Sequence, residues 1–265
     1  MLRVFINIHI NIFAMSEQEL APVEQPTEIV AVPVEKPQGF DRRGSREEES
    51  KVANWVPKTS LGQDVVKGKY ASLNEILTKG LLILEPEIVD YLVPNLKEEM
   101  MYIGGTPGKG GGIKRTATRM TARMHKSGRR YSLTAVAIVG NEDGIVGAGR
   151  GNSIEHRGAI QKATQHAKLG VMQIKRGCGS WECNCQTNHS IPYQAEGKSG
   201  SVTVVLKPAP KGIGIVAHGE TKKILKMAGI KDIWVKSFGQ TSSRINLTFA
   251  VLNALKNLTT RKGDA

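Results

Sequence analysis

The spacing of apolar residues predicts a first folded unit over residues 52–170. A helix is expected to begin at Ser72, an N-cap with Glu75 three residues later, and to end at Gly80. The other predicted elements are a short helix over Glu85–Leu92, strands over Thr116–Met124, Arg129–Val139 and Ile145–Gly149, and a helix over Ile154–Leu169 that Gly170 ends. This order describes one compact α-β-β-β-α unit.

A second apolar pattern predicts another unit over residues 171–258. Strands are expected over Val171–Lys175, Ser201–Leu206 and Ile233–Lys236, and helices over Thr221–Met227 and Ser243–Leu258. Strands that alternate with helices favour an α/β arrangement. The predicted fold class is therefore α+β, with an α/β domain second, and the tail 259–265 is expected to fray.

Residues 1–51 lack these patterns. Met1–Ala14 is apolar, but Asn7, His9 and Asn11 interrupt it, so it is a poor signal peptide and too short to span a membrane. Met15 begins a more ordinary start and is the expected initiator. Residues 16–50 are rich in Glu, Pro, Val and Gln, which predicts an extension that is disordered or follows the surface.

The composition adds a strong positive charge. The 265 residues contain 37 Lys and Arg against 24 Asp and Glu, a formal net charge of +13. Residues 1–50 hold nine acids and five bases, so the rest of the chain carries +17. A body this basic favours polyanionic partners, although charge gives affinity for any phosphate backbone without sequence preference. A merely soluble basic protein is the alternative.

The most informative segment is Lys126–Tyr131, a basic hairpin tip that leads into the apolar strand Ser132–Gly140. A turn at Asn141–Gly144 follows, and then the glycine- and arginine-containing strand Gly144–Arg150. These segments place cations and backbone without side chains on one edge of a small sheet. That arrangement favours contact with an RNA phosphate chain.

Gly104–Arg115 is rich in glycine and lysine and resembles a phosphate loop only in composition. Three residues separate its outer glycines where the nucleotide-binding pattern needs four, and Gly110 follows Lys109 where Ser or Thr is needed. Residues 109–130 contain eight Lys or Arg and no acid. A flexible basic loop that lies on RNA and a disordered insertion are the two open interpretations.

The segment that begins at Gly147 lacks the third glycine of a dinucleotide-binding fingerprint, and no acid follows about twenty residues later. Gly147 and Gly149 are therefore expected to form a tight turn from strand to helix. Arg150 would then lie beside the helix N-terminus, where backbone amides also favour anions.

All three cysteines of the chain lie within eight residues. Cys178, Cys183 and Cys185, with His189, offer three sulfurs and one imidazole, a complete tetrahedral zinc set. Free cysteines in a reduced loop are the alternative, and the odd count disfavours disulfides.

Pro208–Lys223 contains Gly212, Gly214 and Gly219 before a predicted helix, and resembles the phosphate loop of small-molecule kinases. Those kinases place serines where this chain has Ile215 and Val216, so the hydroxyls for metal and phosphate are missing. His125, His156, His166 and His218 have no acid or serine partner at a catalytic spacing. The sequence therefore predicts a binding protein and no enzyme.

Several segments together carry a family resemblance. They are Lys126–Tyr131, Val139–Asn141, Val146–Gly151, Ala159–Ala163, Pro208–Ala217 and Ala228–Asp232. They resemble the universal S-five family of small-subunit ribosomal proteins, and Trp55–Thr59 and Arg176–Cys185 are similar to its archaeal branch. The resemblance covers about Trp55 to Leu258. Met101–Ala122 departs from the short apolar strand usual there, which leaves the bounds of the first strand open.

The resemblance implies a double-stranded-RNA-binding-like domain followed by an α/β domain with a left-handed βαβ crossover. It also implies a structural, non-catalytic role in the cytoplasm, as a part of the small ribosomal subunit that binds its rRNA near the decoding region and the path by which mRNA enters. Support of translational accuracy and neighbours of the S-four and S-eight families follow from it, with no membrane and no small-molecule substrate.

Residue roles carried over by position stay expectations. Contact with rRNA is expected from Lys114, Arg115, Arg119, Arg123, Lys126, Ser127, Gly128, Arg129, Arg130, Gly147, Gly149, Arg150 and Gly151. A loop that faces rRNA and a protein neighbour is expected from Lys211, Gly212, Gly214, Gly219, Lys222 and Lys223. Two other functions are weighed against this one. A free-standing RNA-binding regulator would purify apart from ribosomes, and a kinase-like enzyme would bind ATP with magnesium.

Overall fold

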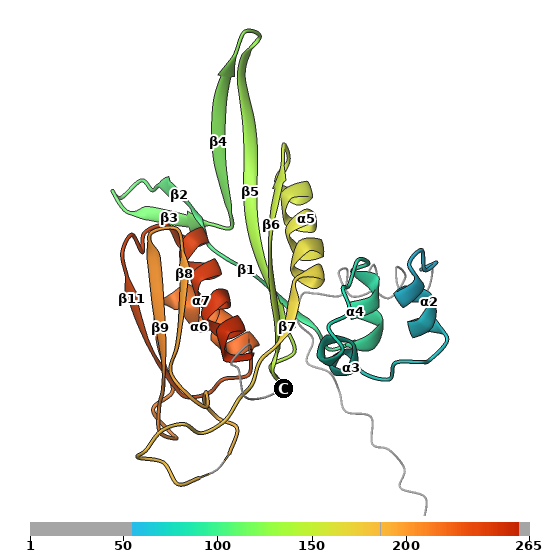
Figure 1. The fold of residues 1–265 in the computed structure, drawn as a ribbon. Helices are drawn as coiled ribbons and strands as arrows, with labels where there is room; N and C mark the ends of the chain where they lie inside the picture. Colours follow the sequence, from blue (N-terminus) through green and yellow to red (C-terminus); the bar gives the residue numbers. More distant parts are fainter. Residues whose placement is uncertain (1–54, 186, 260–265) are drawn as a thin grey trace, which may run out of the picture. The chain divides into compact units, whose positions relative to one another are not determined.

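The computed structural model describes residues 55–185 and 187–259 of the chain as a mixed α+β fold (Figure 1). The expectations for residues 1–51 and for 260–265 lie outside this range. None of the described helices is long and apolar enough to cross a membrane.

Three short helices come first: α2 (Ser60–Val66), α3 (Leu73–Thr78) and α4 (Glu87–Leu92). The sequence predicted the last two and missed α2, which Thr59 caps by accepting a hydrogen bond from the amide of Gly62 at 3.1 Å. Ser72 is confirmed as the N-cap of α3, although its hydroxyl donates to the Glu75 carboxylate at 3.0 Å and accepts no hydrogen bond from a backbone amide. Gly80 follows α3 with a φ of +68°, which confirms the predicted end.

The first sheet contains five strands: β1 (Lys97–Met100), β4 (Thr118–His125), β5 (Gly128–Gly140), β6 (Ile145–Ser153) and β7 (Val171–Gln173). Both β1 and β4 pair with one edge of β5, at opposite ends of it, and β6 pairs with the other edge. The predicted meander is confirmed as β4–β5–β6. Two corrections follow: β1 was missed, and β7, which was expected in the second unit, pairs with β6.

Helix α5 (His156–Leu169) covers one face of β5 and β6. Three glycines of β6 face it. A Cβ at Gly149 would lie 2.2 Å from the Ala167 nitrogen, and one at Gly151 would lie 2.4 Å from the Ala159 oxygen. The turn expected at Gly147 and Gly149 is therefore wrong: these residues lie within β6, and glycine is needed so that the helix backbone can approach.

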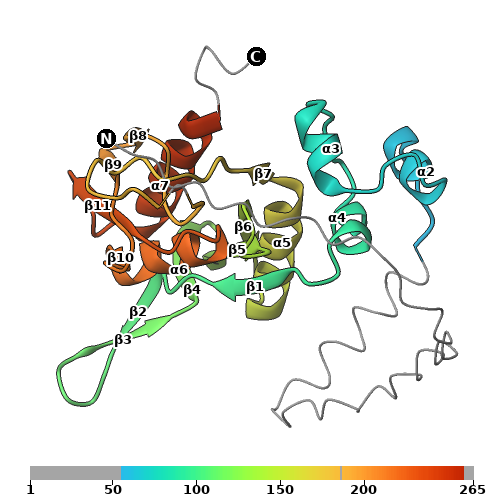
Figure 2. The same ribbon diagram turned by 90° about the horizontal axis from the view of Figure 1, so that it is seen from below.

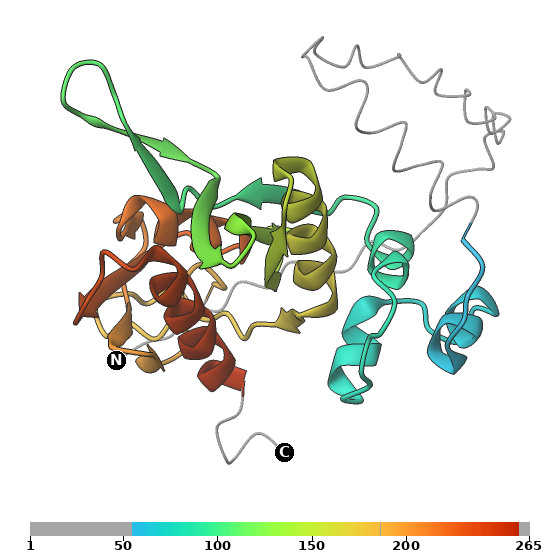
Figure 3. The same cartoon turned by 90° about the horizontal axis from the view of Figure 1, so that it is seen from above.

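Residues 104–116 form a two-stranded hairpin rather than the expected irregular loop. Its strands are β2 (Gly104–Pro107) and β3 (Ile113–Thr116), in antiparallel register. Gly104 permits the turn into the sheet, because a Cβ there would lie 2.1 Å from the Thr118 oxygen. Figure 3 shows this hairpin beside β4.

The second sheet has the order β10–β11–β9–β8. Its strands are β8 (Ala195–Ser199), β9 (Val202–Pro208), β10 (Ile215–Val216) and β11 (Ile233–Phe238), and its helices are α6 (Gly219–Met227) and α7 (Arg244–Thr259). The parallel pairing of β10 with β11 makes β10–α6–β11 a βαβ unit. The predicted α/β arrangement is confirmed, although β8 and β10 were missed.

Two hydrophobic cores meet at β5. Ala135, Ala137 and Val139 pack with α5 and with the N-terminal helices, whereas Val136 and Ile138 pack with α6, α7 and the second sheet. Figure 2 shows β5 and β6 between these layers. Because both faces are buried, the strand is a continuous apolar run here without polar alternation.

Candidate nucleic-acid interface and metal centre

The hairpin formed by β4 and β5 extends beyond the rest of the first sheet (Figure 1). Strand β6 pairs with β5 only from Leu133 onward, so residues 128–132 pair with β4 alone. Every residue from Arg119 to Ser132 is exposed. We name these fourteen residues the ribbon. They contribute almost nothing to either core, and their side chains are free to contact a partner.

The register of the ribbon separates its two faces. Side chains alternate along a strand, and directly opposite residues share a face. One face carries Arg119, Thr121 and Arg123 of β4 with Arg130 and Ser132 of β5. The other carries Met120, Ala122 and Met124 with Arg129 and Tyr131. The sequence predicted the basic tip, and the alternation within 116–124 could have revealed the two faces.

In the described part of the chain, no acidic side chain neutralises the basic face. Arg123 lies directly opposite Arg130, a pairing of like charges that disfavours the hairpin on its own. No acid occurs between Glu99 and Glu142. Among the described residues, the ribbon's arginines and Lys126 form no ion pair. The arrangement is suited to bind closely spaced phosphates.

The tip of the ribbon is a turn at Lys126 and Ser127, between the paired residues His125 and Gly128. Gly128 has a φ of +110°, which side chains rarely adopt. The predicted basic tip is confirmed as a hairpin turn, and its contact with RNA stays a prediction.

A second basic region lies where β3 meets the second unit. Lys114 and Arg115 are exposed on β3. Arg115 lines a cavity of about 300 Å³ together with His218, Ser237, Thr241, Ser242, Arg244 and Leu247. The lining contains three hydroxyls and no carboxylate, and the guanidinium group of Arg115 suits an anion, whereas that of Arg244 lies 3.4 Å from Glu220 and donates to the Tyr102 carbonyl at 2.6 Å.

The residues of β6 that were expected to contact rRNA differ in their exposure. Arg150 is exposed, whereas Gly147, Gly149 and Gly151 are buried against α5. The expectation that Arg150 lies beside the N-terminus of α5 is wrong, because its carbonyl contacts the His166 ring at 2.7 Å, near the other end of that helix. Contact of the three glycines with RNA stays a prediction, and their buried positions give them a packing role.

The residues expected to face rRNA or a protein neighbour lie on both sides of β10 and differ in exposure, and Gly214 and Lys223 are only partly exposed. Lys211, Gly212, Gly219 and Lys222 are exposed. Gly219 begins α6, two residues earlier than predicted, and His218 caps it by accepting from the amide of Glu220 at 3.3 Å.

Lys223 is occupied inside the protein. Its ammonium group lies 3.2 Å from a Glu99 carboxylate oxygen and 4.0 Å from the centre of the Tyr102 ring. It also donates to the carbonyl of Met100 at 3.2 Å. These contacts join α6 to the first sheet, so they give Lys223 a structural role.

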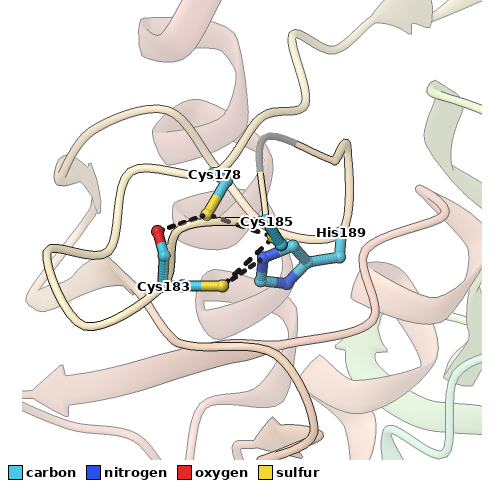
Figure 4. Close-up of side chains that lie close together, drawn as sticks. All are labelled: Cys178, Cys183, Cys185 and His189. Atoms are coloured by element: carbon cyan, nitrogen blue, oxygen red, sulfur yellow. Dashed lines mark hydrogen bonds between the residues drawn. The ribbon is translucent and has the colours of Figure 1, made fainter. Parts of the chain in front are cut away.

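The cysteines and His189 converge in the loop between β7 and β8 (Figure 4). One possible ligand atom from each residue lies within 4.8 Å of all the others. The Cys183 and Cys185 sulfurs are 3.1 Å apart, Cys185 and Cys178 are 3.6 Å apart, and the Cys183 sulfur lies 3.7 Å from Nε2 of His189. A tetrahedral zinc ion with Zn–S bonds of about 2.3 Å requires sulfurs about 3.8 Å apart. The predicted donor set is therefore brought together.

The environment of the sulfurs favours a thiolate. Hydrogen bonds from the Thr187 hydroxyl and amide, and from the Cys183 and Cys178 thiols, lower the pKa of Cys185 to about 6. Burial, followed by hydrogen bonds with the other two thiols, raises the pKa of Cys178. The lowered pKa of Cys185 favours its thiolate, the form that binds a metal.

Asp232 is a residue of this centre that sequence analysis missed. Its carboxylate oxygen Oδ2 lies 2.8 Å from Nδ1 of His189, and both side chains are buried. A hydrogen bond of this kind fixes the imidazole with its other nitrogen available to a metal. Asp232 is 43 positions from His189, and no spacing rule would have linked them.

Comparisons with known proteins agree on one family. Residues 114–175 match the family model described as "Ribosomal protein S5, N-terminal domain", and residues 197–265 match "Ribosomal protein S5, C-terminal domain". The cysteine-containing segment falls between the two matches.

Full-length relatives extend this similarity. The "Small ribosomal subunit protein uS5" of Nanoarchaeum equitans is 52% identical over 209 residues, which cover 78% of this chain and 89% of the relative. The protein of the same name from Staphylothermus marinus is 48% identical over 203 residues, 77% of this chain and 88% of the relative. The one from Methanocaldococcus jannaschii is 44% identical over 207 residues, 78% and 88% respectively.

Proposed function

This chain belongs to the ribosomal protein S5 (uS5) family of the small ribosomal subunit, and from that premise we propose that it binds small-subunit rRNA through the basic face of the ribbon. Proteins of this family are structural and not enzymes. The supporting observation is the opposed pair Arg123 and Arg130, with Arg119 on the same face and no acid in the sequence between Glu99 and Glu142. A bound phosphate chain would attract both arginines and would also remove the repulsion between them, so two electrostatic contributions favour binding.

The proposed mode is recognition of the RNA backbone. Guanidinium groups form paired hydrogen bonds with phosphate oxygens, and the hydroxyl of Ser132 on the same face can donate a further one, whereas that of Thr121 donates to the Ser132 carbonyl at 3.2 Å. Lys126 extends the positive charge to the tip, and Ser127 and Gly128 allow close approach there. The mode selects for RNA shape, since phosphates carry no base sequence.

Further contacts are proposed around the second unit. Lys114 and Arg115 of β3 would bind phosphates beside the anion-suited cavity, and Arg150 would do so from β6. Lys211, Gly212, Gly214, Gly219 and Lys222 would face rRNA or a protein neighbour.

Family resemblance supports a more specific location. We propose that the protein stabilises the decoding region and the path by which mRNA enters, beside members of the S-four and S-eight families, and so supports accurate translation in the cytoplasm. A left-handed sense of the β10–α6–β11 crossover is part of the same inference. Crosslinking of purified subunits, read by mass spectrometry, tests this location. Crosslinks only to proteins outside the S-four and S-eight families would refute it.

The RNA interface is tested with Arg123→Ala combined with Arg130→Ala. The expected result is weaker binding of the full-length protein to purified small-subunit rRNA. The slope of the logarithm of the binding constant against the logarithm of the salt concentration should also become shallower by about two, because each lost phosphate contact removes about 0.9 from it. Incorporation into subunits that survive a high-salt wash should fall in parallel.

Lys67→Ala combined with Lys79→Ala is the matched control, since it removes the same charge from the exposed C-caps of α2 and α3. Equal losses in both double variants would mean that net charge, and not the ribbon, governs binding.

We also propose that Cys178, Cys183, Cys185 and His189 bind one structural zinc ion. The support is the donor set, the convergence of its ligand atoms within 4.8 Å of one another and the hydrogen bond that orients His189. Zinc would crosslink a loop that has little apolar core of its own. Free cysteines are the alternative.

Atomic emission of the purified protein should give one zinc per chain, and Cys183→Ser should abolish it. Glu182→Gln, in the same loop but outside the donor set, should leave it unchanged. A zinc-free native protein with three reactive thiols would refute the proposal.

A further inference from the structure

Asp232 connects two features that are separate in the sequence. It is buried, and its two carboxylate oxygens serve different partners. Oδ2 contacts Nδ1 of His189 at 2.8 Å, and Oδ1 accepts hydrogen bonds from the amides of Gly212 and Gly214 at 3.1 and 2.8 Å. A buried carboxylate is tolerated only with such partners, so these contacts depend on one another.

The segment on the other side of Asp232 is a turn of four residues, Lys211–Gly214, which we name the glycine turn. Gly212 and Gly214 have φ values of +97° and +77°. A Cβ at either position would meet nothing within 4 Å. Hydrogen bonds hold the turn, from the two glycine amides to Asp232 and from the Ile233 amide to the Gly214 carbonyl at 3.2 Å.

The histidine is fixed from its backbone as well. Its carbonyl accepts hydrogen bonds from the amides of Lys231 and Asp232 at 2.9 and 3.1 Å. The hydroxyl of the next residue, Ser190, accepts from the amide of Ala209 at 3.3 Å, just before the turn. The metal loop and the two ends of the β10–α6–β11 unit thus form one hydrogen-bonded group.

We propose that Asp232 is the positioning residue of the metal centre and that metal binding there orders the glycine turn. A metal at Nε2 requires the proton of His189 on Nδ1, where it is donated to Asp232. The carboxylate, held in this orientation, presents its second oxygen to the two glycine amides. When the metal is absent, either nitrogen of His189 can carry the proton, so the hydrogen bond that holds Asp232 as the acceptor of the turn is no longer enforced.

This inference rests on the proposed zinc site, and it deepens the proposed function, because the exposed Lys211 would be presented to rRNA or a protein neighbour only in the metal-bound form. Coupling of this kind is reciprocal. If bound zinc shifts the equilibrium between the disordered and the ordered turn by some factor, ordering of the turn raises the affinity for zinc by the same factor.

Amide hydrogen exchange of the full-length protein, with zinc and after chelation, is the first test. Chelation is expected to raise exchange at Gly212 and Gly214 by about tenfold or more, since second-sphere partners change metal affinity by about 10- to 100-fold. Amides of the β5–β6 ladder, such as Val136 and Ala148, are the internal control and should not change. Unchanged exchange at the turn, in protein that had carried one zinc, would overturn the coupling and leave the zinc site standing.

The reciprocal test is zinc affinity, measured by competition with a chelator. Gly214→Ala strains the turn because alanine disfavours a positive φ, and it should weaken zinc binding by about fivefold. Gly80→Ala is the matched control: Gly80 has a φ of +68° and open space around it, at the end of α3. Equal affinities of the two variants would refute the coupling, even if chelation unfolds the whole protein and hides the exchange result.

Asp232→Asn tests the positioning role itself. Asparagine keeps an oxygen for the glycine amides but turns an N–H group toward His189, which favours the imidazole tautomer that cannot bind through Nε2. Zinc affinity should fall by about 10- to 100-fold, and the cobalt(II) absorption spectrum should show loss of the imidazole ligand. An unchanged spectrum and affinity would overturn the role of Asp232. Protein without any zinc would overturn both the zinc site and this inference.

Discussion

Strand β5 passes through two regions that obey different physical rules. From Gly128 to Ser132 it lies in the exposed ribbon, and from Leu133 to Gly140 it is buried between two cores. In the ribbon, side chains act through charge and can change size freely. In the buried part, the packing leaves no space for even one additional methyl group. Stability is therefore set by the second region, and the proposed RNA binding by the first.

The largest effect is expected from Gly149→Ala in β6, where Gly149 pairs with Ala137 of the buried part of β5. The new Cβ would lie 2.2 Å from the Ala167 nitrogen, so α5 must move, and the free energy of unfolding should fall by about 3 kcal/mol. Chemical denaturation measures it. Gly110→Ala, with nothing within 4 Å, is the control and should change stability by less than about 0.5 kcal/mol. Similar losses for both would contradict the tight packing of α5 on β6.

A smaller effect separates the two faces of the ribbon. Arg130 lies on the basic face and Arg129 on the face with Met124 and Tyr131. Arg130→Ala should weaken rRNA binding by about 1 kcal/mol more than Arg129→Ala, because only the first loses a phosphate contact made together with Arg123. Titrations at two salt concentrations check this. Equal losses would mean that the RNA surrounds the tip instead of binding one face.

Acid should affect the N-terminal helices before it affects the ribbon, which has no acids. Burial opposes ionisation of Glu85, but hydrogen bonds from Thr59, Lys58 and Trp55 outweigh it and lower the pKa of that carboxyl. A lowered pKa gives stability that is present above the ordinary value and lost as the pH falls through the folded value. As the pH is lowered below about 4.5, the melting temperature of the wild type should thus fall further than that of Glu85→Gln. Parallel curves for the two proteins would exclude this role of Glu85.

The smallest effect is expected for stability of the ribbon. Arg123→Ala with Arg130→Ala should leave the free energy of unfolding of the isolated protein within about 0.5 kcal/mol, since exposed substitutions outside packed contacts rarely do more. Thermal unfolding without RNA measures it. A large loss would show that the ribbon is part of the folded core and would remove the contrast between the two regions.

Much of the fold was readable from local patterns. The apolar runs of β5, β9, α5 and α7, the glycines that end helices and the basic tip all depend on neighbours within a few residues. The short strands β1, β8 and β10 were missed because they carry no strong pattern of their own and exist through pairing with longer strands.

The sequence by itself therefore determined the charge of the ribbon, the two-unit α+β plan, the four donors of the proposed metal centre and the family resemblance. Tertiary structure decided which face each arginine occupies, that the β6 glycines serve packing, that Lys223 is engaged, and that Asp232 joins His189 to the glycine turn. The physical reason is range: periodicity and spacing act along the chain, whereas hydrogen bonds between residues 43 positions apart form only once the sheets bring them together.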